Sequence, residues 1–136
     1  MIVYLDTSHL VKLYCKEPDS DQVQQLVNDA DGVATSVLAY AEARATIARR
    51  RRERLITAGE SGIAIKQLDA DWSRFIVLTC DGHLAVEAGR LADVHGVRGA
   101  DAVHLASFAA LLGRSPDDVH FSCADDRLLQ AARSLG

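Results

Sequence analysis

The chain has 136 residues, 49% of them hydrophobic, which is enough to build one core, so we expect a single domain over residues 1–136. No apolar run approaches the roughly 18 residues that a membrane-spanning helix needs, and the chain starts without a basic, cleavable leader. We therefore expect a soluble, cytoplasmic protein. The net charge of −4 gives no global attraction for nucleic acid, so a polyanion would have to be bound by local basic patches or through metal.

Short strand-like runs alternate with longer segments of helical spacing along the chain. We expect strands over residues 2–5, 33–35, 75–79 and 119–122. We expect helices over residues 9–15, 20–28, 37–52, 82–94, 100–112 and 127–135, a turn over 113–117, and a further helix that reaches Trp72 after a weak point at 58–62. Thr35, Ser36 and Asp81 are candidate N-caps. The alternation indicates an α/β fold with a parallel sheet.

Four acidic residues fall where strand and helix ends could direct them to one point, and these are Asp6, Glu42, Asp101 and Asp125. Asp6 follows the first expected strand, at the sheet edge where open α/β sheets bind ligands. By helical projection Glu42 falls within a stripe of Leu38, Ala41 and Ala45, where an unpaired carboxylate would be costly. Metal coordination, a buried Arg partner or a groove-lining position would each remove that cost.

A simpler structural role is open to three of these positions. Asp6, Asp101 and one of the neighbours Asp125 and Asp126 could each cap the helix that follows. One shared cleft explains all four acids together, because gathered like charges repel and favour a divalent cation that neutralises them. Carboxylate oxygens, with no Cys or His residues at the spacing of a zinc site, favour Mg²⁺ or Mn²⁺ over zinc. This pattern is typical of a metal-dependent phosphodiesterase.

Basic residues near these acids are candidates for binding phosphates. A run from Arg49 to Arg52, with Arg54, ends the helix that carries Glu42. The run could contact RNA, form a solvated helix end or contact an acidic partner. Arg98 is nearer the expected cleft, and His104 is expected on its rim or in the core.

Four segments in order resemble PIN-domain ribonucleases, in particular the VapC-type toxins of bacterial and archaeal toxin–antitoxin pairs. The segments are residues 3–14, 35–42, 98–106 and 121–128, and the resemblance covers nearly the whole chain. It implies a three-layer α/β/α fold with a central, mostly parallel sheet of about four to five strands. It also implies that Asp6, Glu42, Asp101 and Asp125, rather than Asp126, hold the metal, and that Ser8 supports their hydrogen bonding.

The activity that this resemblance implies is Mg²⁺- or Mn²⁺-dependent endonucleolytic hydrolysis of RNA, leaving a 5′-phosphate and a 3′-hydroxyl. Candidate RNA contacts are Arg98, Arg49 and Arg50, and a cognate antitoxin protein and a homodimer are the expected partners. The chain departs from the family at Cys123, where Thr or Ser is frequent.

Two other functions remain open, which are an RNA-processing PIN nuclease that is not a toxin and a PIN-fold module that binds RNA or protein without cleavage. A haloacid dehalogenase-like phosphatase would need a second Asp where this chain has Ser8. A dinucleotide-binding module is excluded because no Gly-x-Gly-x-x-Gly follows the first strand.

Overall fold

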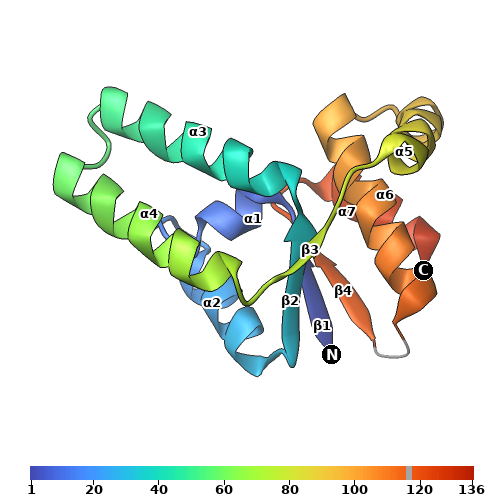
Figure 1. Ribbon diagram of the computed structural model, residues 1–136, viewed down its shortest axis with the longest axis horizontal. Coiled ribbons are helices and arrows are strands. Elements are labelled where there is room, and N and C mark those ends of the chain that lie inside the picture. Colours follow the sequence, from blue (N-terminus) through green and yellow to red (C-terminus); the bar gives the residue numbers. More distant parts are fainter. Residues whose placement is uncertain (116–117) are drawn as a thin grey trace.

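Helices and strands alternate through most of the chain in the computed structural model, which describes residues 1–115 and 118–136 (Figure 1). The strands are β1 (Ile2–Leu5), β2 (Gly32–Ser36), β3 (Ile76–Leu78) and β4 (Val119–Ser122). The helices are α1 (Thr7–Val11), α2 (Ser20–Asp29), α3 (Leu38–Arg52), α4 (Ala58–Trp72), α5 (Gly82–His95), α6 (Gly99–Arg114) and α7 (Asp126–Leu135). None of the helices in the described residues has both the length and the apolar composition that crossing a bilayer requires.

The strands form one sheet in the order β3-β2-β1-β4, and every pairing among the described residues is parallel. Ile2 of β1 lies opposite Gly32 on one side and Val119 on the other. Because the strands are parallel, their carboxyl ends meet at one edge of the sheet. The predicted parallel sheet of four to five strands is confirmed.

Helices cover both faces of this sheet, with α1 to α4 on one side and α5 to α7 on the other (Figure 1). The strand β1 is buried on both faces, as expected for a central parallel strand. Val3 and Leu5 pack with Leu10, while Tyr4 packs on the opposite face with Leu105. The three-layer α/β/α architecture is therefore confirmed, and it brings residues that are distant in sequence to the carboxyl edge.

The starts of α1 and α4 differ most from the sequence prediction, and capping explains both. The first helix spans Thr7–Val11 rather than residues 9–15, and it starts at Thr7 because the Asp6 side chain accepts a hydrogen bond from the His9 backbone N–H. Helix α4 starts at Ala58, where a weak point was expected. There Thr57 and Glu60 form a capping box, each side chain accepting from the other's backbone N–H.

The expected turn over residues 113–117 also differs from the structure. Helix α6 continues through Arg114, and residues 116 and 117 lie outside the described residues. Of the N-cap candidates before α3, the Ser36 hydroxyl accepts from the Leu38 N–H at 3.1 Å. Thr35 lies inside β2 and donates to the carbonyl oxygen of Leu5 instead.

Candidate active site

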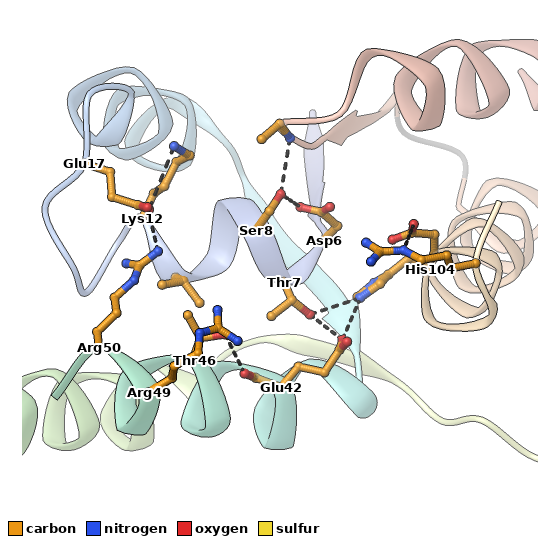
Figure 2. A pocket seen from close by; sticks show the side chains of 14 residues that line it. Asp6, Thr7, Ser8, Lys12, Glu17, Glu42, Thr46, Arg49, Arg50 and His104 are labelled. Carbon is orange, nitrogen blue, oxygen red and sulfur yellow. Dashed lines mark hydrogen bonds and ion pairs between the residues drawn. The ribbon is translucent and has the colours of Figure 1, made fainter. Parts of the chain in front are cut away.

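A cavity of about 480 Å³ opens at the carboxyl edge of the sheet (Figure 2). Three of the four predicted acids line it, and each comes from a different part of the fold: Asp6 follows β1, Glu42 lies on α3 and Asp101 lies on α6. The other lining residues are Thr7, Ser8, Val11, Lys12, Glu17, Thr46, Arg49, Arg50, Arg98, His104 and Ala124. The fold thus brings together acids separated by up to 95 positions in the sequence, from Asp6 to Asp101.

Asp6 is the most buried of these acids, with 5% of its surface exposed. Its Oδ1 accepts hydrogen bonds from the Ser8 hydroxyl at 2.7 Å and from the His9 N–H at 3.0 Å. Burial raises the pKa of Asp6, and these hydrogen bonds oppose the rise. No Lys or Arg in the described part of the chain forms an ion pair with it. The carboxylate is therefore a buried charge that a cation would stabilise.

Ser8 links Asp6 to the segment that follows β4. Its hydroxyl donates to Asp6 and accepts a hydrogen bond from the Ala124 N–H at 3.2 Å (Figure 2). That contact fixes the end of β4 against the start of α1, and it is the kind of contact expected from the role predicted for Ser8.

Glu42 reaches the cavity from a different side of α3 than the helical projection indicated. The buried face of α3 consists of Ala39, Ala43 and Ile47, whereas Ala41 and Ala45 are exposed. The predicted stripe was wrong because α3 packs on α1 and α4 through the neighbouring face. Glu42 itself lies at the border of the buried face, and 31% of its side chain is exposed.

Two neighbours hold the Glu42 carboxylate. Its Oε1 accepts a hydrogen bond from the Thr7 hydroxyl at 2.5 Å and lies 3.3 Å from His104 Nε2 (Figure 2). The hydrogen bond with His104 is the largest cause that lowers the pKa of Glu42, and the Thr7 bond adds to it against the opposing effect of burial. The side chain is therefore held in its ionised form.

His104 lies in the core with its Nε2 at the cavity. Only 2% of its surface is exposed, and its Nδ1 is 2.9 Å from the Tyr4 hydroxyl. The predicted position of His104 on the rim or in the core is confirmed, whereas its contact with Glu42 was not predicted. Thr7 was missed altogether, although its place directly after Asp6, at the sheet edge, is a signal that could have indicated it.

Asp101 lies in the first turn of α6 but does not cap that helix. The N-cap position belongs to Arg98, whose side chain makes no capping hydrogen bond. Asp101 Oδ2 is 3.6 Å from Arg98 Nε, and 21% of the Asp101 side chain is exposed. Asp101 is thus turned toward the cavity, in the turn where the helix dipole favours a negative charge.

Asp125 does not line this cavity in the described residues. It is exposed and caps α7, accepting from the N–H groups of Arg127 and Leu128. Its backbone carbonyl accepts from the Cys123 thiol at 3.2 Å. Asp126 does not line the cavity either and borders a separate hollow beside α2. The role predicted for Asp125 stays a prediction.

Negative charge nevertheless concentrates around Cys123. Burial raises the pKa of the Cys123 thiol to about 12, and the charges of Asp6, Asp125 and Asp101 contribute to the rise. Three of the four predicted acids therefore act on one buried thiol, so they lie in one electrostatic neighbourhood even though Asp125 is at its edge.

The donor atoms suit a hard divalent cation. In the described residues, Asp6 and Glu42 use Oδ1 and Oε1 for hydrogen bonds, while no residue bonds their second oxygens or Oδ1 of Asp101. No three His, Cys, Asp or Glu side chains within residues 1–115 and 118–136 stand close enough together to form a ready-made metal cluster. The three acids fit a cation in their oxygen chemistry and in lining one cavity, although in the described residues they are not already gathered around a single point.

The basic residues of the cavity divide into two kinds. Arg50 donates to Glu17 at 2.6 Å, and Lys12 Nζ lies 3.8 Å from Glu17, so both are held by a carboxylate. Arg98 Nε also lies 3.6 Å from Asp101 Oδ2, but the Arg98 side chain is 90% exposed, and Arg49 is exposed as well. Arg49 and Arg98 are therefore the basic side chains that a ligand entering the cavity would meet first.

Comparison with known proteins agrees with this geometry. The family model described as "PIN domain" matches residues 3–114. The chain belongs to the PIN-domain family. Ribonuclease VapC49 of Mycobacterium tuberculosis (strain ATCC 25618 / H37Rv) is 36% identical to it over 110 residues, which cover 81% of this chain and 76% of the relative. The predicted resemblance to PIN-domain ribonucleases of the VapC type is confirmed.

Solved structures agree with the fold of this PIN domain. FitAcB from Neisseria gonorrhoeae superposes with a TM-score of 0.67 at 19% identity, covering 98% of this chain and 94% of that one. The M. tuberculosis protein VapC20, described as a sarcin-ricin loop cleaving toxin, gives a TM-score of 0.65 at 17% identity, covering 90% and 91%. At such identities the likeness concerns the fold.

Proposed function

We propose that this PIN domain is a divalent-metal-dependent endoribonuclease and the toxin of a toxin–antitoxin pair. The observation that carries the proposal is the convergence of Asp6, Glu42 and Asp101 on one cavity in a chain whose relatives include ribonuclease VapC49. No side-chain nucleophile is needed, because water can attack the phosphodiester.

Mg²⁺ or Mn²⁺ is the cofactor that the donor set favours, since all three acids offer hard oxygen ligands. Asp6, Glu42 and Asp101 would hold the ion, and Asp125 would contribute from the edge of the same acidic region. The ion, when bound, lowers the pKa of a water and stabilises negative charge on the phosphate. The unbonded second oxygens of Asp6 and Glu42 support this assignment.

The protein's own groups prepare the cavity for this reaction. Ser8 and the His9 N–H fix the orientation of Asp6, while Thr7 and His104 keep Glu42 ionised. The acids are thus oriented before the substrate arrives, so little reorganisation is needed during the reaction.

RNA would enter past the exposed basic side chains. Arg49 on α3 and Arg98 at the start of α6 would contact its phosphates, and their lining of the same cavity supports this proposal. Arg50 is assigned a supporting role, since Glu17 already holds its guanidinium. With a net charge of −4, RNA binding would depend on such local contacts and on the cation.

Expression in a bacterium tests the toxin role. Induction of the wild-type chain should arrest growth, and Asp101→Asn, produced at the same level, should not. Equal arrest by both proteins would contradict a nuclease toxin. Normal growth with both, together with RNA cleavage by the purified wild-type protein, would favour an RNA-processing PIN nuclease that is not a toxin.

Three partner and location predictions accompany this proposal, namely a cognate antitoxin protein, a homodimer and the cytoplasm. Co-expression with the protein encoded beside this chain should restore growth and yield a stable complex if that protein is the antitoxin. Light scattering of the purified chain should give twice the 14.7 kDa chain mass if it is a homodimer.

A further inference from the structure

A hydrogen-bonded group of four side chains connects the core of the molecule to the cavity. It consists of Tyr4, His104, Thr7 and Glu42. The Tyr4 hydroxyl lies 2.9 Å from His104 Nδ1, and His104 Nε2 lies 3.1 Å from Thr7 Oγ1 and 3.3 Å from Glu42 Oε1. Thr7 closes the group by donating to the same Glu42 oxygen. Figure 2 shows Thr7, His104 and Glu42 as a triangle of contacts.

The direction of these hydrogen bonds follows from the available protons. Thr7 has one hydroxyl proton, and it points to Glu42. His104 Nε2 faces two oxygen atoms and must therefore carry a proton, because a bare nitrogen would repel the carboxylate. In the neutral ring Nδ1 is then the acceptor, and the Tyr4 hydroxyl supplies its proton. Both protons that reach Glu42 thus go to Oε1, which leaves Oε2 for a ligand.

The group also joins the elements around the acids, because it ties Glu42 on α3 to β1, α1 and α6. Tyr4 lies on β1 two residues before Asp6, Thr7 begins α1, and His104 lies on α6 three residues after Asp101. Tyr4 and His104 are held in place by burial, since only 0% and 2% of their surfaces are exposed. A shift of α3 relative to α6 would therefore break the contacts of Glu42.

We infer that Thr7 and His104 are positioning residues, which hold Glu42 so that its second oxygen is presented to the cation together with Asp6 and Asp101. This inference rests on the proposed metal-dependent function. Residues that orient a metal ligand typically contribute about 10- to 100-fold to metal affinity or activity. The effect should appear in metal binding itself and should not require RNA.

The test compares two substitutions of Thr7 by Mn²⁺ titration, one that keeps the shape of the side chain and one that keeps its hydroxyl. Thr7→Val removes the hydroxyl and should weaken Mn²⁺ binding about tenfold. Thr7→Ser keeps the hydroxyl and should bind within about twofold of wild type. Raising Mn²⁺ should also restore RNA cleavage by Thr7→Val, which a purely structural defect would not allow. Equal Mn²⁺ affinity of Thr7→Val and wild type would overturn the inference.

A second pair of variants tests His104. This pair also keeps the inference testable if melting curves show that Thr7→Val does not fold. His104→Gln retains an N–H donor near Glu42, while His104→Met removes it, so Met should lose more Mn²⁺ affinity than Gln. Equal losses would contradict a positioning role. Wild-type protein that binds no Mn²⁺ and cleaves no RNA would instead refute the proposed function, so the two failures are distinguishable.

Discussion

Asp6 and Asp125 each cap a helix that follows a strand of the same sheet, yet Asp6 is buried while Asp125 is exposed. Both side chains accept hydrogen bonds from backbone N–H groups, so helix capping is one reason for an aspartate at each position. Burial separates them, because a buried carboxylate without a basic partner is costly unless a cation or another function compensates. We therefore expect Asp6 to contribute more to cation binding than Asp125, although both are aspartates that cap a helix.

Substitution by Asn separates the two roles, because Asn caps helices about as well as Asp. Asp6→Asn should fold normally but lose more than about 100-fold in Mn²⁺ affinity, above the range for residues that only orient a ligand. Asp125→Asn should lose much less. Titration of both variants, with melting curves as the folding control, measures this difference, and similar losses would mean that Asp125 is an equal ligand.

Removal of one exposed arginine should weaken RNA binding through a lost phosphate contact. For Arg98→Ala we expect the slope of log affinity against log salt to become shallower by about 0.7 for single-stranded RNA. Arg133→Ala is the matched control, because Arg133 lies on α7 beside the start of β4, away from the acid cavity. Fluorescence titrations in the Asp101→Asn background avoid cleavage. Unchanged slopes for Arg98→Ala would exclude the contact.

The three cysteines should differ in reactivity. Cys80 is exposed, whereas burial raises the pKa of Cys15 and raises that of Cys123 to about 12, so these two remain thiols at pH 8. Alkylation followed by mass spectrometry should modify Cys80 first, and all three in denaturant. Fast modification of Cys123 in the folded protein would show that the acids around it are arranged differently.

Two glycines of α5 give opposite predictions for stability. Gly96 ends the helix with φ +64°, a conformation that strains other residues, so Gly96→Ala should lower the free energy of unfolding by about 1 kcal/mol. Gly89 lies within the helix with open space around it, and Gly89→Ala should raise stability by about 0.5 to 1 kcal/mol. Urea denaturation of both variants measures whether each change raises or lowers the free energy of unfolding. Equal changes in the two variants would contradict the helix end at Gly96.

The fold was largely predictable because strands buried on both faces leave continuous apolar runs, as in β1. The differences arose at local boundaries. The Thr57 and Glu60 spacing is a capping signature visible in the sequence, and it outweighs Gly59 and Gly62 at the start of α4. The start of α1 depends on the Asp6 cap, which the sequence had offered as a structural role for Asp6, whereas periodicity alone placed the helix start at residue 9.

The site was less predictable than the fold. The sequence predicted Asp6 from its place at the end of a strand, and Glu42 and Asp101 from their positions on helices and from the family resemblance; the structure brings all three to one cavity. The contacts of Glu42 with Thr7 and His104 span 35 and 62 positions, and they depend on how α3 and α6 pack around β1. A helical projection of α3 alone could not locate them, and it selected the wrong stripe for the same reason.

Metal-dependent cleavage of RNA at the cavity lined by Asp6, Glu42 and Asp101 can be tested directly. Purified protein would be incubated with total RNA in Mn²⁺ or in chelator, and new 5′ ends would be mapped by sequencing, with Asp101→Asn prepared identically. We predict discrete new 5′-phosphate ends that require both the metal and Asp101. Identical profiles for the two proteins would contradict a nuclease and would favour a PIN-fold module that binds without cleaving.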